Sequence, residues 1–146
     1  MRKQFLIGLA FAAIAAYSCI PDAGMIELIA VSNAAELAYA PQTSNERQIK
    51  VTATLRNIPT GAKTMDFEVS LETHTQSLGD DLAKSSELIA NGEKYQPLSW
   101  EGSPAGGHHR KGILRFKAVV PLPASVELQI RLAADPSPRS FKWLLK

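Results

Sequence analysis

The sequence predicts an all-β fold, an immunoglobulin-like β-sandwich of about seven strands that follows an N-terminal signal segment. Three observations support this fold class. Apolar and polar residues alternate with a period of two in several short segments after residue 46, turns rich in proline and glycine separate these segments, and no helical periodicity follows residue 46. The stretch 46–146 is also about 100 residues long, the usual size of one immunoglobulin-like domain.

The beginning of the chain is typical of a secretory signal peptide over residues 1–18. Met1, Arg2 and Lys3 form a short positive start, and the apolar stretch 5–16 follows it. That stretch is short for a membrane-spanning helix, which needs about 20 apolar residues. We therefore predict an exported protein, located in the periplasm, on the cell surface or on a lipid anchor.

The end of the signal has three alternatives. Residues 16–19 (AYSC) resemble the lipobox of bacterial lipoproteins, which makes Cys19, the only cysteine, a candidate for lipidation. A cut after Ala40 fits an A-x-A pattern, although Pro41 disfavours it, and an uncleaved signal would remain as an anchor. Residues 19–45 are predicted to form a linker or a short helix. We expect contact with the membrane only through a lipid anchor or an uncleaved signal.

The first two predicted strands span 48–57 and 65–73. Apolar residues alternate with polar ones in both strands, and the turn between them, 59–63 (PTGAK), combines proline and glycine. The residues predicted to face the core are Ile49, Val51, Ala53, Leu55, Phe67, Val69 and Leu71.

The middle of the chain contains a predicted hairpin. A polar loop over 73–81 precedes the segment 82–90, which fits either a short strand or a helical turn. The dipeptide 91–92 (Asn-Gly) predicts a two-residue type I′ turn, because both central positions of that turn need a positive φ. The returning strand is 94–100, and Pro97 within it indicates a sheet edge or a bulge.

The last part of the chain is predicted as one long loop followed by three strands. The loop spans 101–112 and contains two adjacent glycines. The strands span 113–120, 126–133 and 140–145, with turns rich in proline between them. The segment 126–133 shows the clearest alternation in the chain.

All three histidines lie in two polar stretches that the predicted topology brings together. His74 follows the second strand, and His108 and His109 lie in the loop 101–112. If consecutive strands run antiparallel, this loop and the loop 73–81 lie at the same end of the sandwich. The three imidazoles are therefore predicted to converge at one pole.

Three imidazoles at one pole predict a copper or zinc site, because neutral imidazole is a common ligand of both ions. Glu72 lies on the same strand face as His74 and is a fourth candidate ligand. Glu101 and Asp80 are further oxygen donors near the two loops.

The adjacent histidines do not easily share one ion. Neighbours in an extended strand point to opposite faces, so one of His108 and His109 is expected to ligate while the other packs on Trp100 or bonds the backbone. The glycines at 106–107 would allow the tight backbone that aims them. A purely structural role is the alternative: one imidazole stacks on Trp100, the other is solvated, and His74 caps the turn after its strand.

Several function classes do not fit the sequence. The net charge of +2 and the lack of a long basic run argue against a nucleic-acid partner. The sequence contains no nucleophile-elbow, zinc-protease, phosphate-loop or CxxC motif, so we predict that the protein is not an enzyme. A blue-copper site needs a cysteine thiolate, and Cys19 precedes the predicted domain.

Three segments, MDFEVSLETHTQSL, YQPLSWEGSPAGGHHRKGILRF and RSFKWLL, carry a resemblance to a family. They resemble a group of small exported prokaryotic immunoglobulin-like domains with a THS-type segment, a tryptophan followed by a GGHHR loop, and a terminal aromatic strand. The resemblance covers residues 48–146, and here Thr75 replaces the serine of the THS form. It implies the sandwich fold and a joint role for His74, His108 and His109, and it implies no reaction.

These observations predict a non-catalytic cell-envelope protein that binds copper or zinc through His74, His108, His109 and Glu72. The alternative is a structural or protein-interaction module of the envelope. Such a module would bind an envelope protein or self-associate, for example by strand addition at a sheet edge.

Overall fold

A computed structural model describes residues 39–56, 58 and 61–145 of the chain. The predicted signal segment and the lipidation candidate Cys19 lie outside these residues, so what the sequence predicts for them stays a prediction. Within the described residues, no helix combines the length and the apolar character that crossing a membrane requires.

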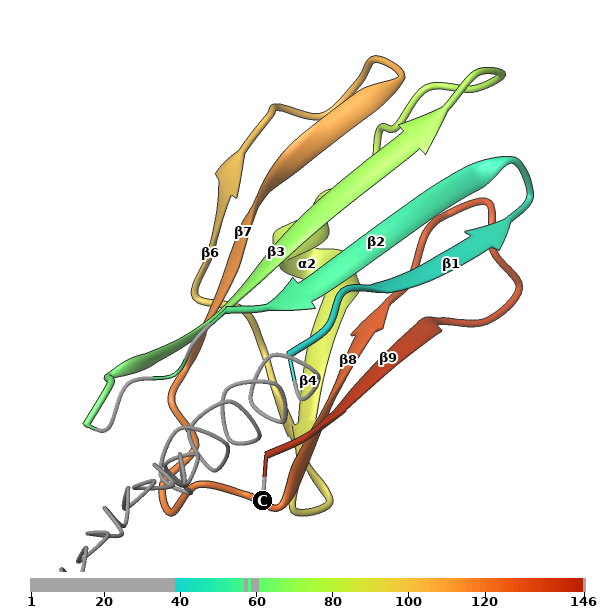
Figure 1. Ribbon diagram of the computed structural model, residues 1–146. Coiled ribbons are helices and arrows are strands. Elements are labelled where there is room, and N and C mark those ends of the chain that lie inside the picture. Colours follow the sequence, from blue (N-terminus) through green and yellow to red (C-terminus); the bar gives the residue numbers. More distant parts are fainter. Residues whose placement is uncertain (1–38, 57, 59–60, 146) are drawn as a thin grey trace, which may run out of the picture.

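The described residues form nine strands in two antiparallel sheets (Figure 1). The first sheet has the order β1-β2-β3-β7-β6, and the second has the order β5-β4-β8-β9. The short helix α2 (Leu82–Ser85) leads directly into β4. The strands are β1 (Gln42–Glu46), β2 (Ile49–Leu55), β3 (Thr64–Thr73), β4 (Ser86–Ala90), β5 (Glu93–Tyr95), β6 (Ser99–Gly102), β7 (His109–Lys117), β8 (Ser125–Ile130) and β9 (Arg139–Leu144).

The strand order is that of an immunoglobulin-like sandwich. If β2 to β9 are taken as strands A, B, C, C′, D, E, F and G, the first sheet contains A-B-E-D and the second contains C′-C-F-G, which is the immunoglobulin arrangement. Strand β1 adds one further strand beside β2. The prediction of an all-β, immunoglobulin-like sandwich is confirmed.

The core lies between the sheets and consists of the inward-facing positions of each strand. Buried and accessible residues alternate throughout β2, β3 and β8, which confirms the predicted strand faces. The ring of Phe67 lies edge-on to Phe116 with 5.6 Å between centroids, and its centroid is 5.4 Å from Trp143 of the opposite sheet. Such aromatic contacts add to apolar burial, and the one between Phe67 and Trp143 joins the two sheets.

The sandwich begins earlier than the sequence predicted. Strand β1 lies almost entirely within the segment that was predicted to be a linker or short helix, and it pairs with β2. The two-residue turn between them consists of Arg47 and Gln48, whose φ values are 49° and 63°. Positive φ in such turns is usually supplied by glycine, asparagine or aspartate, so this hairpin could not be predicted from its turn residues.

The predicted strand 94–100 forms two strands that belong to different sheets. The Asn91-Gly92 turn has φ values of 53° and 80°, which confirms the predicted positive-φ hairpin, and β5 returns along β4. The chain then crosses to the first sheet, where β6 pairs with β7. Pro97 lies in the crossing, where its missing N–H removes no ladder hydrogen bond. The ambiguous segment 82–90 is helix and strand in succession.

The predicted loop 101–112 is shorter in the structure. Strand β6 ends at Gly102 and β7 begins at His109, so residues 103–108 connect them. The two strands approach closely where Gly102 faces Gly112: a Cβ at either position would lie 2.5–2.6 Å from backbone atoms of the other strand. The longer strand places His109 on the sheet.

Side chains close the sandwich where β1 lies beside β9. The guanidinium of Arg139 is buried there and forms a bidentate ion pair with Asp135, at 2.6 and 3.1 Å. The amide of Gln42 bonds both the N–H and the carbonyl of Lys142 in β9. Arg139 also donates to three carbonyl oxygens of the β1–β2 hairpin, those of Ser44 (3.3 Å), Glu46 (2.8 Å) and Ile49 (2.6 Å).

Candidate functional site

The two histidine-bearing loops meet at one end of the sandwich, which we call the histidine pole (loops 74–81 and 103–108 with the first residues of β7). Figure 1 shows both loops at the end opposite to the C-terminus. Backbone hydrogen bonds join them directly: the Thr73 N–H donates to the His108 carbonyl at 2.9 Å, and the Gly106 N–H donates to the Leu78 carbonyl at 2.8 Å. The predicted convergence of the loops is confirmed.

Two glycines shape the loop that carries His108. Gly106 and Gly107 have φ values of 109° and 72°, a region that residues with a side chain rarely occupy. This backbone lets Gly107 offer its carbonyl to the Leu78 N–H at 3.0 Å. The glycine pair therefore folds the loop against its neighbour, as its composition predicted.

Arg110 anchors the pole from inside. Its side chain is buried and its guanidinium carbon lies 5.5 Å from the centroid of the Trp100 ring, so arginine occupies the place predicted for a histidine. Burial lowers the pKa of the Arg110 guanidinium, and the charges of Asp80 and Asp81 oppose that effect. The group donates to three carbonyl oxygens, those of Leu78 (3.2 Å), Asp80 (2.6 Å) and Ser103 (3.4 Å).

The structure brings two of the three imidazoles together. The rings of His74 and His109 lie 6.2 Å apart between centroids, with an angle of 77° between their planes, and both residues are exposed. Position 72 pairs directly with position 109 in the β3–β7 ladder, and the strand alternation places Glu72 and His109 on the same outer face. Three of the four predicted ligand residues therefore share one surface.

His108 is held elsewhere. Its Nδ1 lies 2.9 Å from the Gln76 carbonyl oxygen, so this ring nitrogen donates a hydrogen bond across the two loops. The prediction that one of the adjacent histidines would bond the backbone is confirmed for His108. The physical reason is that His109 begins strand β7, while His108 still belongs to the loop.

The surface beside His74 is hollowed. A depression of about 340 Å³ is lined by Asn45, Gln48, Lys50, Glu72 and His74, among others. The Lys50 ammonium and the Glu72 carboxylate lie 3.4 Å apart across it, and both side chains are about half exposed. The hairpin turn that the sequence did not predict thus forms one wall of the candidate site.

The other predicted oxygen donors have different partners. The Glu101 carboxylate accepts a hydrogen bond from Arg115 at 2.6 Å, and Asp80 Oδ1 accepts one from the Ala133 N–H at 2.9 Å. Among residues 39–56, 58 and 61–145, no group of three or more His, Cys, Asp or Glu side chains is arranged to hold a metal ion. The predicted cluster of three imidazoles is therefore not formed in this part of the chain.

Comparison with protein-family models, with curated proteins and with solved structures gives no match for this chain. The resemblance carried by the THT and GGHHR segments stays a prediction, and the site must be interpreted from its own geometry.

Proposed function

We propose that this chain is a non-catalytic cell-envelope protein that binds a transition-metal ion, Cu(II) or Zn(II), through His74 and His109 on the outer face of the histidine pole. The observation that supports this most is the 6.2 Å between the two ring centroids. An ion held at about 2.1 Å by one nitrogen of each imidazole sets the centroids roughly 5–6.5 Å apart. Small side-chain rotations would therefore complete a two-histidine site.

Glu72 is the proposed third ligand. It lies opposite His109, and cross-strand neighbours have Cβ atoms only about 4.5–5.5 Å apart. To bind the ion, the Glu72 carboxylate must leave Lys50, and exposed ion pairs of this kind contribute only about 0–1 kcal/mol. A divalent cation beside the carboxylate replaces one positive charge with two, which favours the exchange.

A site of two imidazoles and one carboxylate leaves a coordination position open. Structural zinc sites are closed by four protein ligands, whereas an open position lets water or another molecule reach the ion. An exposed, open site suits capture or transfer of an ion more than permanent burial. His108 lies outside the proposed coordination sphere, because its Nδ1 donates to the Gln76 carbonyl oxygen.

Titration calorimetry of the full chain with Cu(II) and with Zn(II) tests this proposal. We expect one ion per chain, with His74→Ala and His109→Ala each weakening binding by about tenfold or more. His108→Ala is the matched control, since it removes an imidazole from the same pole but not from the proposed coordination sphere. Equal binding by wild type and by the double variant His74→Ala with His109→Ala would rule the site out.

Nitrogen hyperfine structure in the Cu(II) electron paramagnetic resonance spectrum gives a second, independent readout. Two coordinated imidazoles are expected in the wild type and in His108→Ala, and one in His109→Ala. If His108→Ala lost one coordinated nitrogen and His109→Ala lost none, His108 rather than His109 would be the ligand.

A second candidate function is docking of a partner strand on β6, and one observation favours it. Strand β6 is an edge of the first sheet, and Leu98 just before it is 62% exposed. An unpaired edge with an exposed apolar residue is a template for strand addition. Size-exclusion chromatography of the full chain tests it: self-association should disappear in Leu98→Asp, and a monomeric wild type at high concentration would contradict self-pairing.

A further inference from the structure

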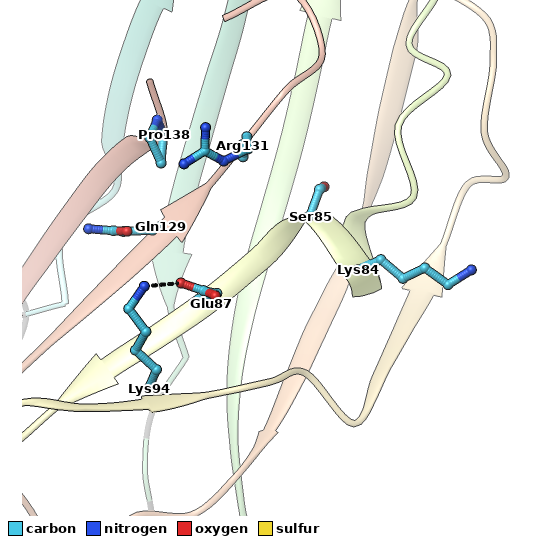
Figure 2. A pocket seen from close by; sticks show the side chains of 7 residues that line it. All are labelled: Lys84, Ser85, Glu87, Lys94, Gln129, Arg131 and Pro138. Atoms are coloured by element: carbon cyan, nitrogen blue, oxygen red, sulfur yellow. Dashed lines mark hydrogen bonds and ion pairs between the residues drawn. The ribbon is translucent and has the colours of Figure 1, made fainter. Parts of the chain in front are cut away.

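A second hollow lies on the outer face of the other sheet. It has a volume of about 170 Å³ and is bordered by side chains from α2, β4, β5 and the end of β8 (Figure 2). Three of its residues, Lys84, Lys94 and Arg131, are cationic, and one, Glu87, is a carboxylate. The hollow is large enough for several water molecules, each of which occupies about 30 Å³ in the liquid, and it carries net positive charge.

Arg131 is the cation that gives this hollow its capacity to bind. Lys84 pairs with Asp81 at 3.2 Å and Lys94 pairs with Glu87 at 2.9 Å, whereas Arg131 makes no ion pair with a described carboxylate. Its guanidinium therefore keeps its planar fork of N–H donors available to a ligand.

The Glu87 carboxylate, which lines the hollow, already has hydrogen-bond partners. Glu87 accepts hydrogen bonds from Lys94 at 2.9 Å and from Gln96 at 3.3 Å, one on each oxygen. The pKa of Glu87 lies below its ordinary value, first because Lys94 donates to it and to a smaller extent because of the Arg131 charge. Since its negative charge is matched by Lys94, Glu87 does not neutralise Arg131.

Ser85 gives a second, independent indication of a ligand. Its Oγ is buried beside the hollow and has no hydrogen-bond partner among the described protein atoms. A buried hydroxyl left in this state is unfavourable by about 1–3 kcal/mol. An acceptor in the hollow would remove this cost once the Ser85 side chain rotates toward it. The Ser85 carbonyl accepts the Arg131 N–H at 2.8 Å, so the backbone fixes the two residues side by side.

We propose that this hollow binds a small oxyanion, a carboxylate or a phosphate, between the Arg131 guanidinium and the Ser85 hydroxyl. The guanidinium fork matches two oxygens of either group, and the Ser85 O–H donates to an oxygen from the side of the helix. Figure 2 shows the Lys94 ammonium beside the Glu87 carboxylate, the Arg131 guanidinium apart from that pair, and Lys84 extending away from the others. Arg131 therefore carries the recognition, because Lys94 is already paired with Glu87.

Nuclear magnetic resonance titration of the full, ¹⁵N-labelled chain tests this site. Inorganic phosphate and acetate are added separately at constant ionic strength, and the amide signals of Ser85 and Arg131 are followed. We expect saturable shifts with at least one of the two ions. Arg131→Gln should weaken binding by about tenfold, the effect of losing a charged hydrogen-bond partner, and Ser85→Ala should weaken it less.

Lys111→Gln is the matched control. Lys111 is an exposed lysine on the first sheet, paired with Glu68 at 2.8 Å, and it does not line the hollow. Its removal changes the net charge as Arg131→Gln does but should leave the titration unchanged. Saturation by phosphate alone or by acetate alone would support the site and identify its oxyanion.

Three results would overturn the proposal: no saturation with either ion, equal binding by Arg131→Gln and wild type, or the same shifts on adding chloride. Chloride screens charge without the paired oxygens that a guanidinium fork recognises. None of these results depends on metal binding at the histidine pole.

Discussion

Two buried arginines hold the ends of two different strands, and they do so with different partners. Arg139 makes five hydrogen bonds, two of them to the buried Asp135 carboxylate and three to backbone carbonyls. Arg110 makes three, all to carbonyls, and its Nε has no partner in the described protein. Arg139 is neutralised by a buried ion pair. Arg110 makes no ion pair with a described carboxylate and is stabilised by carbonyl dipoles, the face of Trp100 and the nearby charges of Asp80 and Asp81.

The difference follows from the turns that the arginines support. Arg110 lies beneath the loop 103–108, where Gly106 and Gly107 supply the positive φ values without strain. Arg139 holds carbonyls on both sides of the Arg47-Gln48 turn, which has positive φ values without a glycine. The Arg47-Gln48 turn, whose residues disfavour positive φ, is therefore held by an arginine that also forms a buried ion pair. The loop 103–108, which has glycines at its positive-φ positions, is held by an arginine with fewer hydrogen bonds.

The largest expected effect comes from Arg139→Met. This change leaves Asp135 buried without its cation, and breaking a buried pair in this way destabilises by about 3–5 kcal/mol. Urea denaturation followed by circular dichroism measures the free energy of unfolding. The double variant Arg139→Met with Asp135→Leu should recover part of the loss, because it removes both buried charges. A loss below about 1 kcal/mol in the single variant would contradict the comparison.

Arg110→Met should have a smaller effect, about 1–3 kcal/mol, because it leaves carbonyls unpaired but no buried carboxylate behind. It should also weaken Cu(II) or Zn(II) binding, since the loops that carry His74 and His108 lose their common anchor. Lys111→Met, at the exposed neighbouring position, is the control for both measurements. If Arg110→Met were as unstable as Arg139→Met, a buried carboxylate left without its cation would not be the reason for the larger loss of stability.

Next in size is the exchange of the two hairpin turns. Arg47→Asn with Gln48→Gly places asparagine and glycine at two positive-φ positions, and relief of that strain should stabilise the fold by about 1–2 kcal/mol. The reverse exchange, Asn91→Arg with Gly92→Gln, should destabilise by a similar amount. Thermal denaturation of both variants gives the comparison. In the Arg139→Met background, Arg47→Asn with Gln48→Gly should raise the free energy of unfolding by more, because Arg139 no longer holds that turn.

The turn chemistry also explains which part of the fold the sequence could predict. Alternation along β2, β3 and β8 identified the buried faces, because a half-buried strand must alternate to keep one side apolar. The Asn91-Gly92 turn was predictable because its signal is local. Strand β1 was not, because the residues that hold its turn lie about ninety positions away, at Arg139 and Asp135.

At the site, topology was predictable but side-chain direction was not. Antiparallel succession was enough to bring the histidine loops together. Which two imidazole rings lie close together depends on where β7 begins. The predicted loop extended to residue 112, so the start of β7 at His109 was not predicted. Counting back in steps of two from the buried Phe116 and Leu114 through Gly112 reaches Arg110, so strand parity places this arginine inside and His109 outside. That signal lay in the sequence.

The smallest expected effect concerns an ion pair on the surface, where the comparison with Arg139 is sharpest. Glu68 lies 2.8 Å from Arg56 and 2.8 Å from Lys111 on the outer face of the first sheet. The Lys111 hydrogen bond, with the charges of both cations, lowers the pKa of Glu68 below its ordinary value of 4.5. A carboxyl with a lower pKa in the folded state adds stability above its unfolded value and loses it as the pH falls through the folded value.

Glu68→Gln should therefore lower the free energy of unfolding by no more than about 1 kcal/mol at neutral pH. In acid, once the pH has fallen through the lowered folded-state pKa of Glu68, wild type and variant should converge, because the carboxyl is then protonated in both the folded and the unfolded state. Urea denaturation at both pH values, repeated with added salt, tests this, because screening weakens an exposed pair but not a buried one. A loss at neutral pH that survives salt and rivals that of Arg139→Met would mean that burial is not what separates the two kinds of ion pair.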